Sequence, residues 1–386
     1  MRKWLALPAL ALSLGLGACD GLFGLGDDAN DGALYTMTNA AGANHVLVFS
    51  RGDDGRLTFR DSVSTGGAGS GPDPVFGTDP LTSQDAVILS DDHRFLFVVN
   101  AGSNEISSFR VGNDGMLTLA NKVSSGGTFP VSLSARSTLL YVVNANNGGN
   151  ISGFSIGSDG TLTPIAGSTR PLSGAAVPGP GSIRISPNGQ TIVVTEKPTN
   201  LLDIYAIGSN GVATGPTVVG ASGPTPFGAD FAPSGPYIVS LGNIGPNRMA
   251  VPDGSGAGSL VFTAPTTPST VSGFVPTTET AACWVQITPD GRFAYTTNTA
   301  SGSITGFSIA TNGALTPLTG DGKTGVTGPN TQPLDMAFAD GYLYALTAGD
   351  RGVHVFRVSS NGALTARNEL DVIGFFPVSV TGLAAY

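Results

Sequence analysis

The stretch VVNAGSNEISSFRVGNDGMLTL, residues 98–119, decides the fold, because it is one of six similar copies in the chain. An apolar residue, Ile106, is followed three positions later by Phe109 and six positions after that by Gly115. The glycine is followed by Leu117 and Thr118, and five further copies keep the spacing. The glycines of the six copies are Gly55, Gly115, Gly160, Gly211, Gly313 and Gly362. A weaker seventh copy is Gly258-Ser259-Leu260.

These glycines are 60, 45, 51, 47, 55 and 49 residues apart when Gly258 is included, which is the period of a repeated supersecondary unit. Each of the six follows Asp or Asn, and such dipeptides tolerate the positive φ of a tight hairpin turn. Upstream of the repeats are short runs rich in β-formers, at 95–99, 140–143, 294–297 and 342–346. Further turn sequences, at 187–189, 289–291 and 339–341, come just before runs of β-forming residues.

The pattern predicts four antiparallel strands per unit, and a four-stranded unit repeated about every 50 residues is typical of a β-propeller. Residues 33–386 comprise 354 residues, so a mean step of about 51 residues gives seven units. The tail 377–386 has the pattern of an innermost strand, whereas the segment 33–39 begins at a second strand. We therefore expect an all-β, seven-bladed β-propeller in which the C-terminal strand completes the first blade and removes the open sheet edges.

The composition limits the classes of partner. The chain has 386 residues, of which 56 are glycine and only 12% are charged, while 40% apolar content is sufficient for a core. The formal net charge of −9 would repel a phosphate backbone, and no local cluster of Lys and Arg offsets it. We therefore expect no nucleic-acid partner.

The N-terminus has the features of an export signal. Arg2 and Lys3 precede an apolar run, residues 4–16, that is too short to span a bilayer. The sequence Leu16-Gly17-Ala18-Cys19 then resembles the bacterial lipoprotein box, in which the cysteine is lipidated and becomes the first residue. An ordinary signal peptide with an incidental cysteine is the alternative.

This interpretation divides the chain into a signal peptide at 1–18, a lipidated Cys19 with a flexible tether at 19–32, and the propeller at 33–386. An acyl chain on Cys19 would hold the body at a membrane surface. We expect a bacterial cell-envelope location, facing the periplasm or the exterior. Cys283 is the one cysteine left after Cys19, so no intramolecular disulfide is available.

The repeats carry a family resemblance. Units of the form I-x-G-F-x-I-x-x-x-G-x-L-T-P, with Ala282-Cys283-Trp284-Val285 leading into 288–292 and 295–298, resemble the seven-bladed lactonase-like propeller family related to bacterial 6-phosphogluconolactonase. The resemblance covers essentially all of residues 33–386. It implies the propeller fold and the hydrolysis of a lactone.

Candidate site residues come from the ends of the second strands, which a propeller places near the mouth of its channel. Polar side chains occupy five of the six positions considered, with Ala348 the exception. Asn can cap a turn there by bonding its own backbone, or a ring of amides can line a ligand pocket. The five polar residues are Asn39, Asn100, Asn144, Glu196 and Asn298.

Three other features are candidates for chemistry. Glu196 replaces an amide by a carboxylate that could act as a general base for water attack on an ester carbonyl, although Lys197 beside it also fits a solvated ion pair. Arg248 lies in the irregular fifth unit and would suit a carboxylate or phosphate, unless that unit has simply diverged. Trp284 is a candidate ligand-binding residue that also fits packing on an inner strand.

Metals and cofactors are not expected. The three histidines, at 45, 93 and 354, fall in different units, and no His or Cys pair has metal-ligand spacing. Acidic pairs such as Asp53-Asp54 lack the alternating spacing of a calcium loop.

Two functions remain open from the sequence. The one that we prefer at this point is a lipid-anchored binding or scaffold module for a glycan, a peptide or an envelope protein. The chain lacks a His-Pro-His segment like that of the 6-phosphogluconolactonase branch, and its expected export separates it from a cytoplasmic sugar phosphate. The alternative is a hydrolase that opens an extracytoplasmic lactone, with Glu196 as base and Arg248 or the Asn ring polarising the carbonyl.

Overall fold

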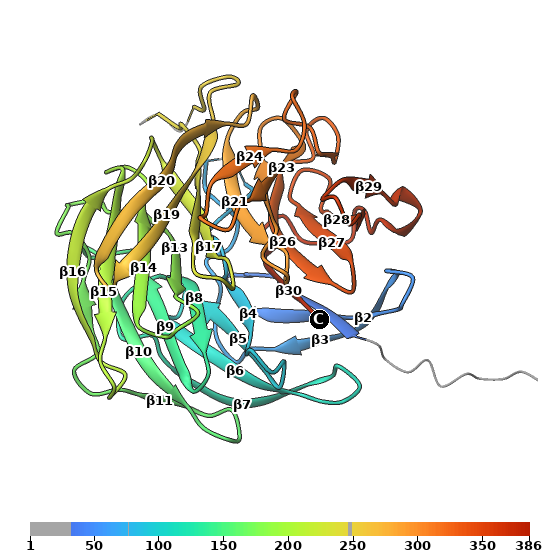
Figure 1. The fold of residues 1–386 in the computed structure, drawn as a ribbon. Helices are drawn as coiled ribbons and strands as arrows, with labels where there is room; N and C mark the ends of the chain where they lie inside the picture. The colour runs from blue at the N-terminus through green and yellow to red at the C-terminus, as the bar shows by residue number, and fades with distance from the viewer. Residues whose placement is uncertain (1–31, 76, 246–248) are drawn as a thin grey trace, which may run out of the picture.

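The fold is a ring of seven antiparallel β-sheets around a central axis (Figure 1). The computed structural model describes residues 32–75, 77–245 and 249–386. Within these ranges the one helical element is the 3-10 turn η1 (Asn368–Leu370). The all-β, seven-bladed prediction is confirmed.

The first four blades are given from the innermost strand outward. The first contains β30 (Thr381–Ala385), β1 (Gly32–Met37), β2 (His45–Arg51) and β3 (Leu57–Ser64). The second contains β4 (Val87–Leu89), β5 (Phe95–Asn100), β6 (Glu105–Val111) and β7 (Leu117–Ser124). The third contains β8 (Pro130–Arg136), β9 (Leu139–Asn144), β10 (Asn150–Ile156), β11 (Leu162–Pro164) and the short β12 (Arg170–Pro171) beside β10. The fourth contains β13 (Pro180–Ile185), β14 (Thr191–Glu196), β15 (Leu201–Ile207) and β16 (Ala213–Gly220).

The other three blades follow in chain order. The fifth contains β17 (Pro226–Phe231), β18 (Tyr237–Leu241), β19 (Gly256–Ala264) and β20 (Thr267–Pro276). The sixth contains β21 (Ala282–Ile287), β22 (Phe293–Asn298), β23 (Ser303–Ile309), β24 (Leu315–Pro317) and the short β25 (Gly325–Val326) beside β23. The seventh contains β26 (Pro333–Ala339), β27 (Tyr342–Thr347), β28 (Gly352–Val358) and β29 (Leu364–Ala366).

The ring closes through the C-terminal strand, as the sequence predicts. Strand β30 pairs with β1, with Leu34 opposite Ala385 and Thr36 opposite Leu383. The backbones of Ala33 and Tyr386 also exchange two hydrogen bonds. The two ends of the chain therefore share one blade, and the inner edge of that blade is covered.

The repeat glycines connect neighbouring blades as well as shaping hairpins. All six have φ between 75° and 91°, which only glycine adopts without strain. The carbonyl of each accepts a hydrogen bond of 2.5 to 3.0 Å from a hydroxyl of the preceding blade. The donor and acceptor pairs are Tyr344 and Gly55, Tyr35 and Gly115, Ser108 and Gly160, Tyr141 and Gly211, Ser259 and Gly313, and Tyr295 and Gly362. Each of the six copies thus serves two purposes: its glycine allows the turn to form, and the glycine carbonyl joins the blade to the preceding one.

The prediction that Gly258-Ser259-Leu260 forms a seventh copy of the hairpin repeat is wrong. Gly258 lies within β19, opposite Val239, and not in a hairpin turn. The turn between β19 and β20 lies at Pro265-Thr266, because Ala264 pairs with Thr267. In this blade Ala257 and Leu260 take the apolar positions, and the turn carries no glycine.

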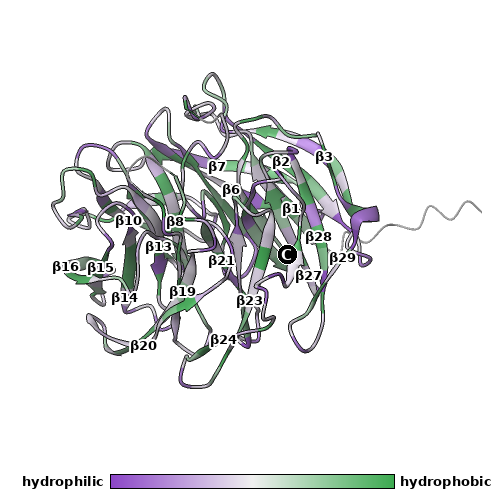
Figure 2. Ribbon diagram, turned by 90° about the horizontal axis from the view of Figure 1, so that it is seen from above, coloured by the Kyte–Doolittle hydropathy of each residue, from purple (hydrophilic) through white to green (hydrophobic). Residues whose placement is uncertain are grey.

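The core consists of apolar side chains packed between the faces of adjacent sheets. Figure 2 shows hydrophobic colour along many strands. Large buried side chains include Tyr35, Tyr141 and Tyr295, which are fully enclosed. In the described part of the chain, no helix has the length and apolar character needed to cross a membrane.

Candidate functional site

The central channel is occupied by residues 82–85, which we call the channel segment. It lies in the long connection between β3 and β4 and hydrogen-bonds to inner strands of several blades. Ser83 Oγ donates to the Val131 carbonyl of β8 (2.8 Å), and the Gln84 backbone N–H donates to the Gly181 carbonyl of β13 (2.8 Å). Trp284 Nε1 of β21 donates to the Ser83 carbonyl (3.0 Å).

The side chain of Gln84 extends these contacts across the axis. Its Nε2 donates to the carbonyls of Ala229 on β17 (3.1 Å) and Val285 on β21 (2.9 Å). Its Oε1 accepts from the Val285 N–H (2.9 Å). The backbone N–H of Asp85 donates to Asp335 Oδ2 of β26 (3.3 Å). The segment therefore contacts the inner strands of five blades and closes the middle of the channel.

Charged side chains surround one end of this segment. Arg184 on β13 contacts Asp85 Oδ2 through Nη2 (3.0 Å) and Asp230 Oδ1 through Nε (3.5 Å), and Nε donates to the Ala229 carbonyl (2.9 Å). The side chains of Arg184, Asp85 and Asp230 are 16%, 11% and 21% exposed, although Asp85 Oδ2, the oxygen that faces Arg184, is buried. With Asp335 they form what we call the channel cluster.

The cluster holds more carboxyl groups than its guanidinium neutralises. Burial raises the pKa of Asp85 to about 7, with Arg184 opposing the shift and Asp230 adding to it. Burial and the neighbouring Asp85 raise the pKa of Asp335 well above its usual range, and burial raises that of Asp230. Burial lowers the pKa of Arg184, but the three carboxylates outweigh it, so the guanidinium stays charged. A carboxyl that titrates near neutrality beside a fixed cation is a typical arrangement for general acid–base chemistry.

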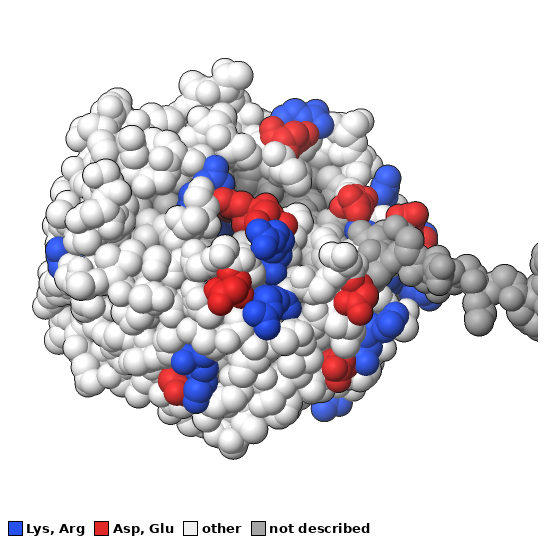
Figure 3. All heavy atoms as spheres, turned by 90° about the horizontal axis from the view of Figure 1, so that it is seen from below, with Lys and Arg blue, Asp and Glu red and all other residues white. Residues whose placement is uncertain are grey.

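Figure 3 shows a hollow in the lower face of the molecule, and acidic and basic side chains gather around it while most of that face is uncharged. Charges concentrated at a concave site focus the electrostatic field there. In the channel cluster itself, charge coincides with partial exposure of the Arg184, Asp85 and Asp230 side chains.

Lys197 lies at the other end of the channel segment. Its Nζ donates to the carbonyls of Thr82 and Pro180 (2.8 Å for Pro180) and stands 4.9 Å from the centre of the Phe227 ring. These contacts connect the end of β14 to the channel segment. Burial raises the pKa of the nearby Cys283 thiol to about 12, so this cysteine is not a thiolate nucleophile at neutral pH.

The backbone of this region carries strain. Asp79, Thr82 and Asp85 have φ values of 48°, 47° and 65°, in the left-handed region that non-glycine residues rarely adopt. Such conformations persist where surrounding contacts impose them, and sixteen other non-glycine residues of the described chain also have positive φ. Next to these residues, the Thr82 N–H donates to Asp79 Oδ1 (3.1 Å).

Glu196, the predicted base, ends β14 but lies outside the channel cluster. It is fully buried, and its carboxylate accepts hydrogen bonds from Ser173 N–H (3.1 Å), Ser173 Oγ (2.9 Å) and Thr199 Oγ1 (2.7 Å). Asp203 on β15 also accepts from Ser173 N–H (3.0 Å) and hydrogen-bonds to Glu196. Burial and this neighbouring carboxyl raise the pKa of Asp203 to about 8. The catalytic role of Glu196 stays a prediction, and a lactone would reach it only after these contacts open.

The predicted asparagines likewise have no exposed surface. Asn100 Nδ2 donates to Ser107 Oγ (2.8 Å), and Asn298 Nδ2 donates to Thr305 Oγ1 (2.9 Å). These two residues, like Glu196, end a second strand and contact the third residue of the next strand. The remaining two bond elsewhere within their own blade or its connecting loop. Asn144 contacts Asn150, and Asn39 contacts Ser70.

The other predicted residues are dispersed. Trp284 is buried on β21, where its ring lies 4.8 Å from that of Phe227 and its indole N–H holds the channel segment. Arg248 and Cys19 lie outside the described residues. Ligand binding by the asparagines and Trp284, and catalysis by Arg248, therefore remain predictions.

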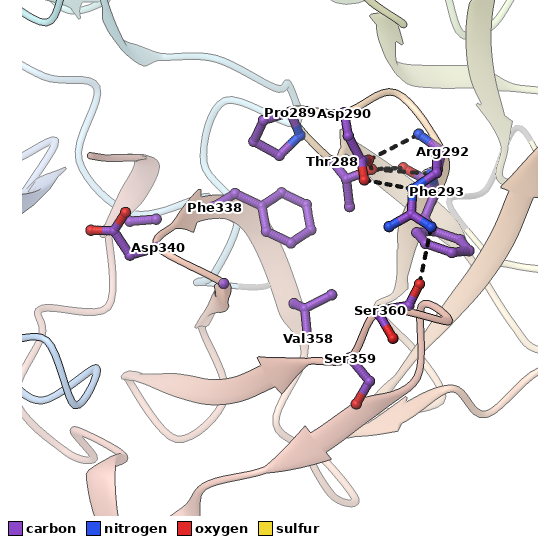
Figure 4. A pocket seen from close by; sticks show the side chains of 12 residues that line it. Thr288, Pro289, Asp290, Arg292, Phe293, Phe338, Asp340, Val358, Ser359 and Ser360 are labelled. Atoms are coloured by element: carbon purple, nitrogen blue, oxygen red, sulfur yellow. Dashed lines mark hydrogen bonds and ion pairs between the residues drawn. The ribbon is translucent and has the colours of Figure 1, made fainter.

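Shallow grooves open between neighbouring blades. One, of about 300 Å³, lies between the turns that join β21 to β22 and β26 to β27, with Phe338, Phe293 and Val358 in its walls (Figure 4). Arg292 is tied there to Asp290 (2.6 Å) and to the Ser360 carbonyl (3.1 Å). A second groove, of about 560 Å³, occupies the corresponding place between the fourth and fifth blades. Their recurrence marks them as features of the repeat.

A metal centre finds no support in the described ranges, where no group of three or more His, Cys, Asp or Glu side chains has a geometry that could hold an ion. The carboxylates of the channel cluster are instead arranged around Arg184. The prediction from the sequence that the protein uses no metal and no cofactor stays a prediction.

The sequence reasoning missed the channel cluster. Its members come from the channel segment and from the inner strands β13, β17 and β26, and no spacing along the chain connects them. One signal was present: Arg184 in Ile183-Arg184-Ile185 and Asp230 in Ala229-Asp230-Phe231 are charged residues within otherwise apolar inner-strand runs. A charged side chain at such a position either points into the channel or is buried, and burial of an unpaired charge costs free energy.

Comparison with known proteins agrees with the architecture. The sequence matches the family model described as "Lactonase, 7-bladed beta-propeller" over residues 43–172 and 78–374. The 6-phosphogluconolactonase of Cronobacter sakazakii is 25% identical over 307 residues, which cover 76% of this chain and 86% of that protein. The 6-phosphogluconolactonase of Serratia proteamaculans is 25% identical over 274 residues, 69% of this chain and 78% of that protein.

Solved structures show the same fold. The periplasmic gluconolactonase of Pseudomonas aeruginosa superposes with a TM-score of 0.63 at 17% identity, covering 90% of this chain and 98% of its own. A protein of Lactobacillus plantarum superposes with a TM-score of 0.66 at 16% identity, covering 92% and 99%. At these identities the likeness concerns the fold alone.

Proposed function

The chain belongs to the seven-bladed β-propeller lactonase family, and from this premise we propose that it hydrolyses a lactone at the channel cluster. The observation that carries the proposal is the pairing of Asp85, with a pKa of about 7, and Arg184 at a partly exposed end of the channel. A base with a pKa near the working pH combines ionisation with useful proton affinity.

The geometry suggests a division of roles. The Asp85 carboxylate takes a proton from a water molecule whose oxygen attacks the lactone carbonyl carbon. Arg184 stabilises the negative charge that develops on the carbonyl oxygen. When the ring C–O bond breaks, the proton held by Asp85 passes to the leaving alkoxide oxygen, and the product is a hydroxy acid. Asp335 and Asp230 are positioning residues, since they hold the Asp85 backbone N–H and the guanidinium.

Family membership favours this hydrolase over the binding or scaffold module preferred from the sequence. The grooves between blades are where a binding function would be sought, but they recur with the repeat and carry few charged groups that are free of turn contacts. The hydrolase proposal is supported by the channel cluster, which does not recur from blade to blade. Glu196 remains the alternative base.

The cell-envelope location also remains a proposal. It is supported by the apolar run and the Leu16-Gly17-Ala18-Cys19 sequence, which lie outside the described residues. Expression in a bacterial host with an alkyne fatty acid tests it, because wild-type protein would carry the label and the Cys19→Ser variant would not. An unlabelled wild-type chain would exclude the lipid anchor.

The activity is tested by following proton release from a panel of neutral and phosphorylated sugar lactones with the purified full chain. We expect saturable turnover, and a loss of about 10²-fold or more in kcat for Asp85→Asn because the general base is removed. Asp53→Asn, in an exposed hairpin turn, is the matched control. Equal thermal unfolding midpoints for the three proteins would show that the change is not caused by misfolding.

A comparison of Asp85→Asn with Glu196→Gln separates the two candidate bases. Loss of turnover in the first variant alone supports the channel cluster. Loss in Glu196→Gln alone moves the base to the end of β14. No turnover by wild type on any lactone in the panel would contradict the hydrolase proposal.

A further inference from the structure

The charges of the channel constrain which lactone it can accept. Arg184 is engaged with Asp85, Asp230 and the Ala229 carbonyl, and Lys197 is engaged with two carbonyls of the channel segment and β13. Both basic side chains that these contacts place in the channel therefore have acceptors from the protein itself. The carboxyl groups of the cluster outnumber its one guanidinium.

A phosphate group would be poorly accommodated here. Proteins bind phosphate through Arg or Lys groups that present several N–H donors to its oxygens. In this channel Arg184 Nε and Nη2 already contact Asp230 and Asp85, so a phosphate at this guanidinium would lie beside two carboxylates. Such uncompensated charge is costly in a partly buried place.

Sugar hydroxyl groups suit the same cluster. Carboxylates are strong acceptors, and each hydroxyl supplies a donor without adding charge. Asp230 is the most exposed member of the cluster, at 21%, so its carboxylate is available for such a contact. We infer that the substrate is a neutral, hydroxyl-rich lactone and not a phosphorylated one, an inference that rests on the proposed hydrolase function.

The titration behaviour of the cluster points the same way. The pKa values of Asp85, Asp230 and Asp335 are all raised, chiefly because burial disfavours the charged form of each carboxyl. A phosphate dianion would add to the charge that these groups already disfavour. The neutral substrate adds none.

The experiment compares kcat/KM of the full chain for glucono-δ-lactone and for its 6-phosphate, with proton release as the readout. At about 6 Å and an effective dielectric constant of about 20, one unit of like charge lowers the value for the phosphorylated lactone roughly a hundredfold. Because screening weakens repulsion at a partly exposed site, raising the salt from about 0.05 M to about 0.5 M should narrow the gap.

A variant that removes one charge tests whether repulsion by the channel cluster causes the preference for the neutral lactone. Asp230→Asn removes one carboxylate from the cluster and should raise the ratio of the two kcat/KM values toward the phosphorylated lactone by up to roughly a hundredfold. Asp53→Asn removes the same charge from an exposed turn and should leave the ratio as in wild type. The ratio is insensitive to the fraction of folded enzyme, so partial misfolding of Asp230→Asn does not obscure the result.

The outcomes separate the inference from the proposal beneath it. Preference for the neutral lactone that shrinks with salt and with Asp230→Asn supports the inference. Equal or faster hydrolysis of the 6-phosphate overturns the inference and leaves the hydrolase function standing. Hydrolysis of neither compound, nor of any other lactone in the panel, overturns both.

Discussion

Two groups of buried carboxyls in this propeller have the same chemistry and different surroundings. In the channel cluster, Asp85 and its acidic neighbours surround Arg184, and part of each ion pair remains exposed to water. In the fourth blade, Glu196 and Asp203 contact each other and are held by Ser173 and Thr199, with no exposed surface. The pKa of Asp85 rises to about 7 and that of Asp203 to about 8, chiefly through burial in both places.

The difference shows that a raised pKa does not by itself identify a reactive carboxyl. The Glu196–Asp203 pair occupies the place that Asn100 and Ser107 occupy in the second blade, and Asn298 and Thr305 in the sixth. It is therefore a variant of a contact that joins the second and third strands of a blade. The channel cluster has no such counterpart, and it combines a cation with access to water.

The largest expected effect is from Arg184→Met, which removes the cation and leaves the carboxylates of the channel cluster unpaired. We expect the free energy of unfolding at pH 7 to fall by about 3–5 kcal/mol. The loss should be smaller at pH 5, where protonation removes part of the charge. Urea unfolding at both pH values measures it, with Arg94→Met, an exposed turn residue, as the control. Equal losses for the two variants would mean that Arg184 does not hold the cluster together.

The pH dependence of turnover distinguishes the two groups. Asp85 accepts a proton only when ionised, so kcat/KM should rise about tenfold per pH unit up to its pKa of about 7 and then level off. A pH–rate profile of wild type and Asp203→Asn measures this. Both should give the same profile, because Asp203 lies outside the channel. A profile that moves in Asp203→Asn would assign the titration to the fourth blade.

Asp203→Asn should also change stability in a pH-dependent way. Because its pKa is about 8 in the folded protein and near 4 in the unfolded chain, the folded state holds the extra proton, and wild-type stability falls as pH rises from about 4 to about 8. The amide needs no proton to donate to Glu196. We expect the variant to be more stable than wild type by about 2–4 kcal/mol at pH 8 and similar at pH 4.

Thermal unfolding across this pH range measures the difference, with Asp61→Asn on the exposed face of β3 as the control. Identical pH dependence in wild type and Asp203→Asn would show that the pair does not hold a shared proton. Another group would then have to balance the negative charge of the buried Glu196 and Asp203 carboxylates.

The smallest expected effect comes from making the amide position of the second blade acidic. Asn100→Asp removes the donor to Ser107, while Oδ1 keeps its acceptor role toward Thr65 (2.7 Å). We expect a loss of about 1–2 kcal/mol in the free energy of unfolding at neutral pH. Urea unfolding of Asn100→Asp and of the exposed control Asn113→Asp measures it. An unchanged midpoint for both would show that this position accepts a carboxyl without a partner such as Asp203.

The fold could be predicted because its signals are local. Each Asp-Gly or Asn-Gly pair marks a hairpin through a backbone conformation that other residues avoid, and the same phrase recurs at a regular step. The fifth blade shows the limit of that reasoning, since its Pro265-Thr266 turn lacks glycine and the phrase at Gly258 lies within a strand. The repeat spacing therefore predicts the fifth blade correctly but places its outer hairpin turn at the wrong residues.

The candidate site could be predicted only in part. The ends of the second strands are polar, as expected, but Asn100, Asn298 and Glu196 turn into their blades and bond to the next strand. A sequence shows that such a side chain ends a strand, whereas its direction depends on the hydroxyl or carboxyl that the following strand offers.

The sequence by itself determined the all-β propeller, its seven blades and its closure by the C-terminal strand, because turn conformation and strand periodicity act over a few residues and are repeated. The tertiary structure alone decided the channel cluster, because ring closure brings Asp85, Arg184 and Asp335 from three blades to one axis. Their pKa values and pairing depend on burial and distance across that axis, and neither quantity is present in the order of residues along the chain.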